Sequence, residues 1–129
     1  MARWTPRRYG LQIPILGKRR GGPMYANMRQ YRISRERIDE TMHLADTELA
    51  DRLADEPGFV AYELMASEDG NVCSMTICQD REGAERSQEI AADFVREHLS
   101  GIEIERTGSM IGEVMVSRAR EQVLVPAHH

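Results

Sequence analysis

The stretch that most constrains the fold runs from Pro57 to Gln79, where two segments rich in β-branched and aromatic residues flank Asp69-Gly70. The Asp-Gly dipeptide readily adopts the positive φ angles of a tight hairpin turn. Pro57-Gly58 ends any preceding element, because proline cannot continue a helix and glycine accepts backbone angles that other residues resist. The stretch therefore predicts a β-hairpin with strands over 59–66 and 72–79.

A helical pattern lies on each side of this hairpin. Residues 35–55 follow a candidate N-cap, Ser34, and Asp80 can cap a second helix that ends at Ser100-Gly101. In both segments apolar residues recur at steps of three and four, which places them on one face of a helix. These stripes comprise Ile38, Met42, Ala45, Leu49 and Leu53 in the first helix, and Ala84, Ser87, Ala91, Phe94, Val95 and His98 in the second.

Two further segments complete the order of elements. Residues 24–33 alternate in a way that suits a strand covered on both sides, and residues 110–119 form a last apolar segment after a connector over 102–109. The resulting order is β-α-β-β-α-β. We therefore expect an α+β fold, a ferredoxin-like split βαβ arrangement with a four-stranded antiparallel sheet.

Two helices can cover only one face of such a sheet. The other face is expected to carry apolar side chains, and a large exposed apolar patch usually marks an interface. We expect a homodimer in which two copies pair through this face. The candidate side chains for it are Tyr25, Tyr62, Met75 and Met115.

Length and charge narrow the class of protein. The 129 residues fit one domain, and the sequence contains no apolar run long enough to cross a membrane. Residues 1–23 carry six basic and no acidic side chains, whereas the remainder carries eleven basic and twenty-one acidic ones. This acidic body argues against nucleic acid as a partner.

Cys73 and Cys78 point to opposite faces of one strand and cannot pair, so a reduced, cytoplasmic protein is expected.

The two ends differ from the body. Within the basic leader, residues 1–23, Arg7-Arg8 precedes a short apolar patch, as in a twin-arginine export signal, but the patch contains Pro14 and no clear cleavage site follows. A basic arm that contacts an anionic surface is a second interpretation, and a disordered or adventitious leader is the third and favoured one. The domain is expected over 24–119, followed by a tail over 120–129.

Four segments carry a resemblance to a known family: Tyr25-Ala26-Asn27-Met28-Arg29-Gln30-Tyr31, Pro57-Gly58-Phe59-Val60-Ala61-Tyr62, Ala84-Glu85-Arg86-Ser87 and Ala91-Ala92-Asp93-Phe94-Val95. In this combination the chain resembles the antibiotic-biosynthesis-monooxygenase-like family of dimeric α+β barrels. The resemblance covers about residues 24–119, and it implies a cofactor-independent, quinone-forming oxygenase that acts on a small aromatic or polyketide-like substrate.

A haem-degrading branch of the same superfamily uses an Asn in the first strand, and a Trp and a His ten residues apart on the second helix. Here His98 stands at the histidine place, but Gln88 stands ten residues earlier and the only tryptophan is Trp4 in the leader. The sequence therefore does not support haem degradation, and we expect neither a cofactor nor a metal site.

The candidate chemistry is proton abstraction from a phenol. His98 is the candidate catalytic base by residue type, because the free pKa of histidine lies near neutrality. A histidine at a helix C-terminus is also favourable for structural reasons alone. Asn27, Arg29 and Tyr31 share one strand face and are the candidates to bind an anionic or phenolic ligand, with Phe94 beside them, although a polar stripe at a dimer seam is the alternative.

Two functions remain open from the sequence. The first is a cofactor-independent monooxygenase-like enzyme. The second is a non-catalytic dimeric α+β barrel that binds a small hydrophobic ligand or acts as a scaffold. The eight methionines suit either function, because methionine adapts to irregular space.

Overall fold

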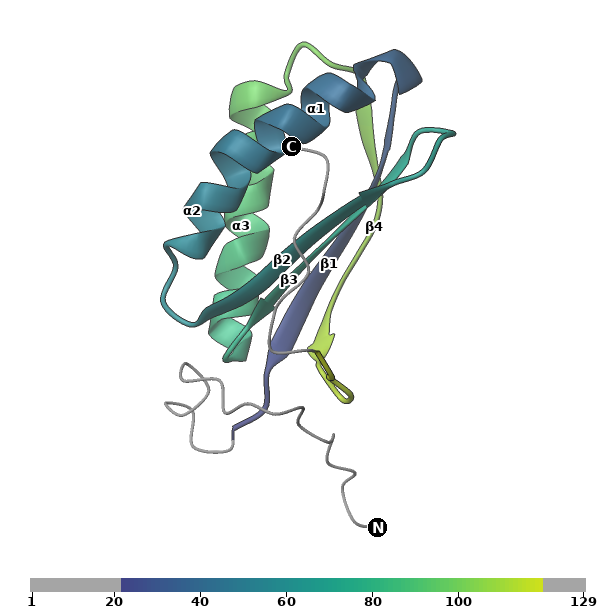
Figure 1. Cartoon of the computed structure of the whole chain (residues 1–129). Coiled ribbons are helices and arrows are strands. Elements are labelled where there is room, and N and C mark those ends of the chain that lie inside the picture. The colour runs from purple at the N-terminus through teal and green to yellow at the C-terminus, as the bar shows by residue number, and fades with distance from the viewer. Residues whose placement is uncertain (1–21, 120–129) are drawn as a thin grey trace.

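The computed structural model of the chain describes residues 22–119 (Figure 1). The expectations for the twin-arginine segment and for the tail after residue 119 lie outside these residues. The order of elements is β1 Tyr25–Ile33, η2 Arg35–Arg37, α1 Ile38–Leu44, η3 Ala45–Leu49, α2 Ala50–Ala54, β2 Phe59–Ala66, β3 Asn71–Cys78, α3 Arg81–His98 and β4 Ile104–Glu113.

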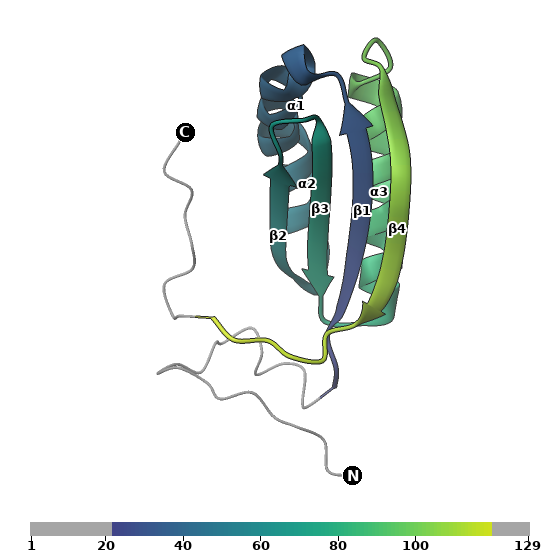
Figure 2. The same ribbon diagram turned by 90° about the vertical axis from the view of Figure 1, so that its right-hand side faces the viewer.

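The four strands form one sheet in the order β2-β3-β1-β4, and every neighbouring pair is antiparallel. All helices lie against the same face, with α1 and α2 behind β2 and β3, and α3 behind β1 and β4 (Figure 2). The opposite face has no cover among the described residues. The predicted α+β, β-α-β-β-α-β arrangement is confirmed. No helix in this range has the length and apolar character that a membrane crossing requires.

The first helical segment is continuous from Arg35 to Ala54 but changes its winding. A 3₁₀ turn starts it, and a π-helical turn over Ala45–Leu49 separates α1 from α2. Ser34 does not cap this segment as expected: its hydroxyl donates to the Glu36 carboxylate at 2.8 Å instead of accepting a backbone N–H. The predicted cap of α3 is confirmed, because the Asp80 carboxylate accepts from the Gly83 backbone N–H at 2.8 Å.

The last strand begins six residues earlier than predicted. β4 covers residues 104–113, most of the expected connector, and Met115 and Val116 follow it as exposed residues. The physical reason is pairing: Ile104 lies opposite Ile33 at the end of β1 and packs against the core. Because β4 is an edge strand, its polar residues can face solvent. These polar residues interrupt the apolar pattern by which a strand is predicted from the sequence.

The first half of β1 has the opposite pattern from an ordinary surface strand. Asn27 and Arg29 are buried beneath the helices, whereas Met28 lies on the open face; after them the ordinary pattern returns, with Gln30 exposed and Tyr31 buried. Both neighbours fix this alternation, since β1 pairs with β3 on one side and with β4 on the other.

Two residues expected on the open face lie on the helix face instead. Tyr25 pairs with the buried Cys78, and Tyr62 pairs with the buried Thr76, so both follow the helix-facing rows of the sheet. Met75 does lie on the open face, as predicted, and is 39% exposed. Cys73 and Cys78 are free thiols on opposite faces, as their spacing predicted.

Gly70 is expected to be the glycine on which the hairpin depends most. Its φ is +96°, and a Cβ there would lie 2.6 Å from the Ile33 carbonyl oxygen, because the hairpin tip bonds to the end of β1. Gly70→Ala should lower the free energy of unfolding by roughly 2–4 kcal/mol in urea titration, the sum of backbone strain and displaced packing.

Gly58 and Gly101 are the controls. Gly58 also has a positive φ, +83°, but a Cβ there meets only ordinary contacts, so Gly58→Ala should lower the unfolding free energy by about 1 kcal/mol. Gly101→Ala, with nothing within 4 Å of its Cβ, should change little. Equal losses at Gly70 and Gly101 would contradict the assigned turn.

Candidate functional site

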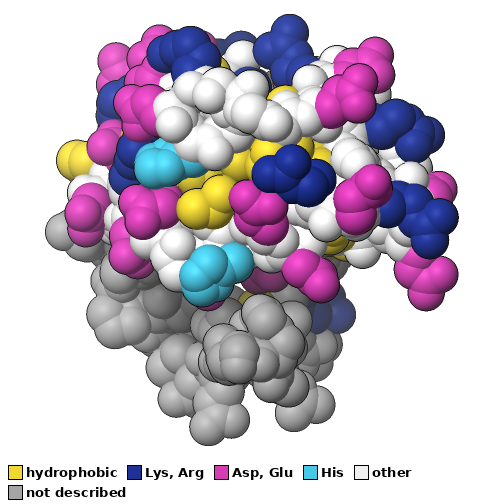
Figure 3. All heavy atoms as spheres, turned by 90° about the horizontal axis from the view of Figure 1, so that it is seen from above, with side chains coloured by type: hydrophobic (Ala, Val, Ile, Leu, Met, Phe, Trp, Pro, Cys, Tyr) yellow, Lys and Arg dark blue, Asp and Glu magenta, His cyan; other side chains and the backbone are white. Residues whose placement is uncertain are grey.

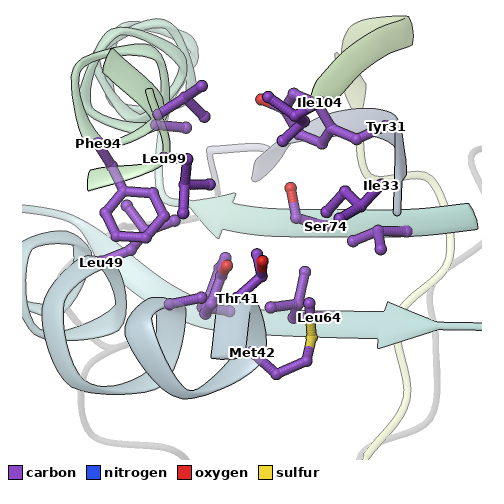
Figure 4. A pocket seen from close by; sticks show the side chains of 15 residues that line it. Tyr31, Ile33, Thr41, Met42, Leu49, Leu64, Ser74, Phe94, Leu99 and Ile104 are labelled. Carbon is purple, nitrogen blue, oxygen red and sulfur yellow. The ribbon is translucent and has the colours of Figure 1, made fainter. Parts of the chain in front are cut away.

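A small cavity lies between the helix face of the sheet and the helices. Its volume is about 40 Å³, which exceeds the roughly 10–15 Å³ that a water molecule needs but is far below the roughly 150 Å³ of a cavity that binds benzene. Its walls come from β1, β2, β3, β4 and the helical segments (Figure 4). The residues that line it are Tyr31, Ile33, Thr41, Met42, Ala45, Leu49, Tyr62, Leu64, Val72, Ser74, Ala91, Phe94, Val95, Leu99 and Ile104.

The cavity lies toward the end of the molecule where β1 ends and β4 begins, because Ile33, Leu99 and Ile104 line it. Seen from that end, hydrophobic side chains show at the centre of the surface, and charged side chains surround them (Figure 3). The π-helical turn contributes two lining residues, Ala45 and Leu49, and such turns are frequent at functional sites. Met42 lines the same side and can change its rotamer to make room.

Four hydroxyl-bearing residues line this otherwise apolar cavity: Tyr31, Thr41, Tyr62 and Ser74. The Thr41 hydroxyl is occupied, since it donates to the Arg37 carbonyl oxygen at 2.7 Å. The Tyr62 hydroxyl is buried and has no hydrogen-bond partner among residues 22–119. Burial raises the pKa of the Tyr62 phenol, with smaller contributions from Tyr31 and Asp46, so the group stays protonated and can donate to a ligand.

A polar cluster continues along β1 below the cavity. Asn27 is 2% exposed and donates to the Ser87 hydroxyl at 3.3 Å, and Ser87 donates to the Ala84 carbonyl oxygen. The Asn27 side-chain oxygen is buried without a partner. Arg29 is 4% exposed, and its Nε–H donates to the Tyr31 hydroxyl at 2.6 Å. Tyr31 therefore connects this polar cluster to the cavity.

His98 lies outside this arrangement. It is at the C-terminal end of α3, its ring contacts Phe94 with centroids 5.3 Å apart, and it is absent from the cavity lining. Its Nε2 lies 3.3 Å from an Arg52 Nη. Arginine can only donate, so this contact requires an unprotonated Nε2. In this conformation the His98 side chain does not reach the cavity, so it cannot take a proton from a ligand there.

The structure therefore brings together part of the predicted set. Asn27, Arg29 and Tyr31 share one buried face, Tyr31 and Phe94 line the cavity, and His98 stands behind Phe94. The cavity hydroxyls of Thr41, Tyr62 and Ser74 were missed. Thr41 within an apolar helical stripe, and Ser74 at a buried position of an alternating strand, were the available signals.

Cysteine and metal chemistry find little support among residues 22–119. Burial raises the pKa of Cys78 to about 11, with a contribution from Asp80, so this thiol is a weak nucleophile at neutral pH. In the same range, no three His, Cys, Asp or Glu side chains lie close enough to hold a metal ion.

The two tyrosines of the cavity predict opposite effects of the same change. Tyr62→Phe removes a buried hydroxyl without a partner, so the free energy of unfolding should stay equal or rise by up to about 1 kcal/mol. Tyr31→Phe removes the hydroxyl that accepts a hydrogen bond from Arg29, and should lower the free energy of unfolding by roughly 1–3 kcal/mol. Urea titration of both variants checks this. A large loss in Tyr62→Phe alone would show that its hydroxyl is bound.

Neither a family model nor a curated protein matches this chain. Solved structures do. A candidate antibiotic biosynthesis monooxygenase from Nitrosomonas europaea has a TM-score of 0.60 at 12% identity, over 73% of this chain and 92% of that one. A dimeric ferredoxin-like protein from an uncultured marine organism has a TM-score of 0.59 at 16% identity, over 75% of this chain and 99% of that one.

HapK from Hahella chejuensis is a third such structure, with a TM-score of 0.56 at 13% identity, over 70% of this chain and 91% of that one. At these identities the likeness concerns the fold. The resemblance that the sequence suggested is confirmed at that level: the chain has the ferredoxin-like α+β fold of antibiotic-biosynthesis-monooxygenase-like and dimeric ferredoxin-like proteins.

Proposed function

We propose that this protein binds a small aromatic or hydrophobic molecule between the sheet and the helices and oxidises it as a cofactor-independent monooxygenase. The observation that carries the binding site is the apolar cavity with one buried, unpartnered hydroxyl, that of Tyr62. Small-molecule sites are typically apolar with a few placed polar groups. The likeness to the Nitrosomonas europaea structure supports the reaction class.

The reaction needs no external reductant. A base removes the proton of a phenol, and the phenolate then gives electrons to O₂. One oxygen atom forms the new C=O bond at a ring carbon, the other leaves as water with the two hydrogens that the substrate loses, and the product is a quinone. Tyr31 and Tyr62 line the cavity, so their hydroxyls would donate to an oxygen anion there, and Phe94 and Leu49 would exclude water.

The space available sets a condition on this proposal. An aromatic ring needs more room than about 40 Å³, so lining side chains must move when a ligand enters. Met42 lines the cavity, is only partly buried, and is the side chain best able to move. His98 is the proposed base, and it would have to leave Arg52 and turn past Phe94 to reach the ligand.

Oxygen uptake tests the reaction. With phenols and naphthols as substrates, we expect one O₂ consumed for each molecule oxidised and no hydrogen peroxide. The methyl ethers of the same phenols are matched controls, because they have no proton to lose. His98→Ala should slow uptake by roughly 10²–10⁴-fold if His98 is the base.

The same experiment separates the second function. A rise in melting temperature with the same phenols, without oxygen uptake, would favour the non-catalytic ligand-binding barrel. Normal oxygen uptake in His98→Ala would contradict the assigned base and leave the oxygenase proposal standing.

We further propose that a second copy of the chain covers the open face of the sheet, forming a homodimer. The register places Met75, Met28 and Met110 in one row across β3, β1 and β4, with Glu63 of β2 opposite Met75 at the edge of the sheet, and Met110 is 62% exposed. Rows of Ala61, Ile77, Ala26 and Gly112, and of Met65, Cys73, Gln30 and Gly108, flank it. Such an apolar face is unusual on a monomer, and the uncultured marine organism's ferredoxin-like protein is named as dimeric.

Light scattering should give the wild type twice the 14.7 kDa of one chain. Met28→Lys should shift it to one chain mass, because Met28 lies between Met75 and Met110 and the burial of an unpaired ammonium at a sheet interface is unfavourable. Thr47→Lys, which adds the same charge at an exposed position of η3, should remain dimeric. A dimer that survives Met28→Lys together with Met110→Lys would place the interface elsewhere.

A further inference from the structure

We infer that the ligand of this cavity is an organic anion, and that Arg29 binds its charged oxygen together with the Tyr31 hydroxyl. The inference rests on the proposed function of the cavity and adds the chemical class of the ligand: a small aromatic carboxylate or phenolate. The uncharged part would occupy the cavity beside Phe94.

Arg29 is a buried cation without a counterion. It is 4% exposed, and its guanidinium forms no salt bridge with any carboxylate of residues 22–119. Its only hydrogen bond to another described residue runs from Nε to the Tyr31 hydroxyl, at 2.6 Å. A guanidinium has five N–H donors, so the terminal nitrogens of Arg29 have no partner among residues 22–119, although they are not fully shielded from solvent.

This arrangement is unfavourable for stability alone. Burial of a charge is costly unless it is paired, and an apolar side chain of similar size is usually tolerated at least as well. The arginines of residues 22–119 that form ion pairs, such as Arg37 with Glu40 and Arg52 with Glu97, are paired at the surface. Arg29 differs from them because it is 4% exposed and has no carboxylate partner in the same range, so an incoming anion would meet a cation without a counterion.

Two neighbours connect Arg29 to the cavity. Tyr31 and Ser74 both line the cavity, and Arg29 lies opposite Ser74 in the pairing of β1 with β3. Tyr31 accepts from Arg29, so its own O–H remains able to donate. An anionic oxygen at this end of the cavity would therefore find a hydroxyl donor in front and a cationic donor behind it.

Asn27 limits where the anion can lie. It is two residues before Arg29 on the same buried face of β1, and its side-chain oxygen has no partner among residues 22–119. An amide oxygen and an anion both only accept hydrogen bonds, so the charged oxygen is expected beside Arg29 and Tyr31 and away from the Asn27 oxygen.

Benzoate and benzamide are the matched probes, because they share shape and differ in charge. We expect titration calorimetry to show benzoate binding about tenfold or more tightly than benzamide, as charge-assisted hydrogen bonds are stronger than neutral ones. In Arg29→Met this preference should disappear, while the melting temperature stays equal or rises. Arg37→Met, which removes an exposed and paired arginine, should keep the wild-type preference.

para-Nitrophenol separates a phenolate site from a carboxylate site. Its phenolate absorbs in the visible range and its neutral form does not, so at one fixed pH the spectrum reports which form is bound. A bound phenolate fraction above that of the free probe, lost in Arg29→Met, would assign a phenolate site. A preference for benzoate without this change would assign a carboxylate site.

The outcomes distinguish the two levels of the proposal. Equal binding of benzoate and benzamide to the wild type would overturn the anion inference and leave the cavity as a ligand site. Failure of every probe to bind would overturn the proposed cavity function and the inference with it. A benzoate preference unchanged in Arg29→Met would overturn the role of Arg29.

Discussion

The alternation of β1 is the constraint on which the rest of this structure depends. Because β1 pairs with β3 on one side and β4 on the other, a shift of one residue would exchange its two faces completely. In the register that forms, Asn27 and Arg29 face the helices, and Met28 faces outward. An ordinary half-exposed strand would have the reverse pattern, with polar side chains in water and apolar ones in the core.

Two consequences follow from this inversion, and both concern function. Polar side chains under the helices reduce stability unless they find partners, and the Asn27 side-chain oxygen and the Tyr62 hydroxyl have none among residues 22–119. Apolar side chains on the open face reduce solubility unless something covers them. In the function that we propose, β1 contributes polar groups to a ligand site on one face and apolar side chains to an interface with a second copy of the chain on the other. The upper core, around Leu49, Leu53 and Phe94, supplies the packing that tolerates these groups.

The fold was predictable because its signals are local. The positive φ of Gly58 and Gly70, the Asp80 cap and the helical stripes all depend on neighbours in the sequence, and the structure contains each of them. β4 was misplaced because an edge strand needs few apolar residues, so the apolar run near Met115 was taken for the strand instead. Tyr62 was placed on the wrong sheet face because the register shift between Phe59 and Ala61 cannot be read from alternation alone.

The site was only partly predictable, for a different reason. The cavity takes residues from seven elements between β1 and β4, and no short motif connects Thr41, Tyr62 and Ser74 in the sequence. The shared face of Asn27, Arg29 and Tyr31 could be predicted because it lies within one strand. The burial of Arg29 without a counterion could not, since it depends on which carboxylates the fold leaves out of reach.

The central claim is that ligands bind on the helix side of the sheet while the methionine row on the other side is reserved for a partner chain. Methyl NMR of protein with ¹³C-labelled methionine methyl groups tests it directly, because Met42 lines the cavity whereas Met28, Met75 and Met110 lie on the open face. On addition of benzoate we predict that the Met42 signal shifts and the three open-face signals do not. A shift confined to the open-face methionines would contradict this division of the two faces.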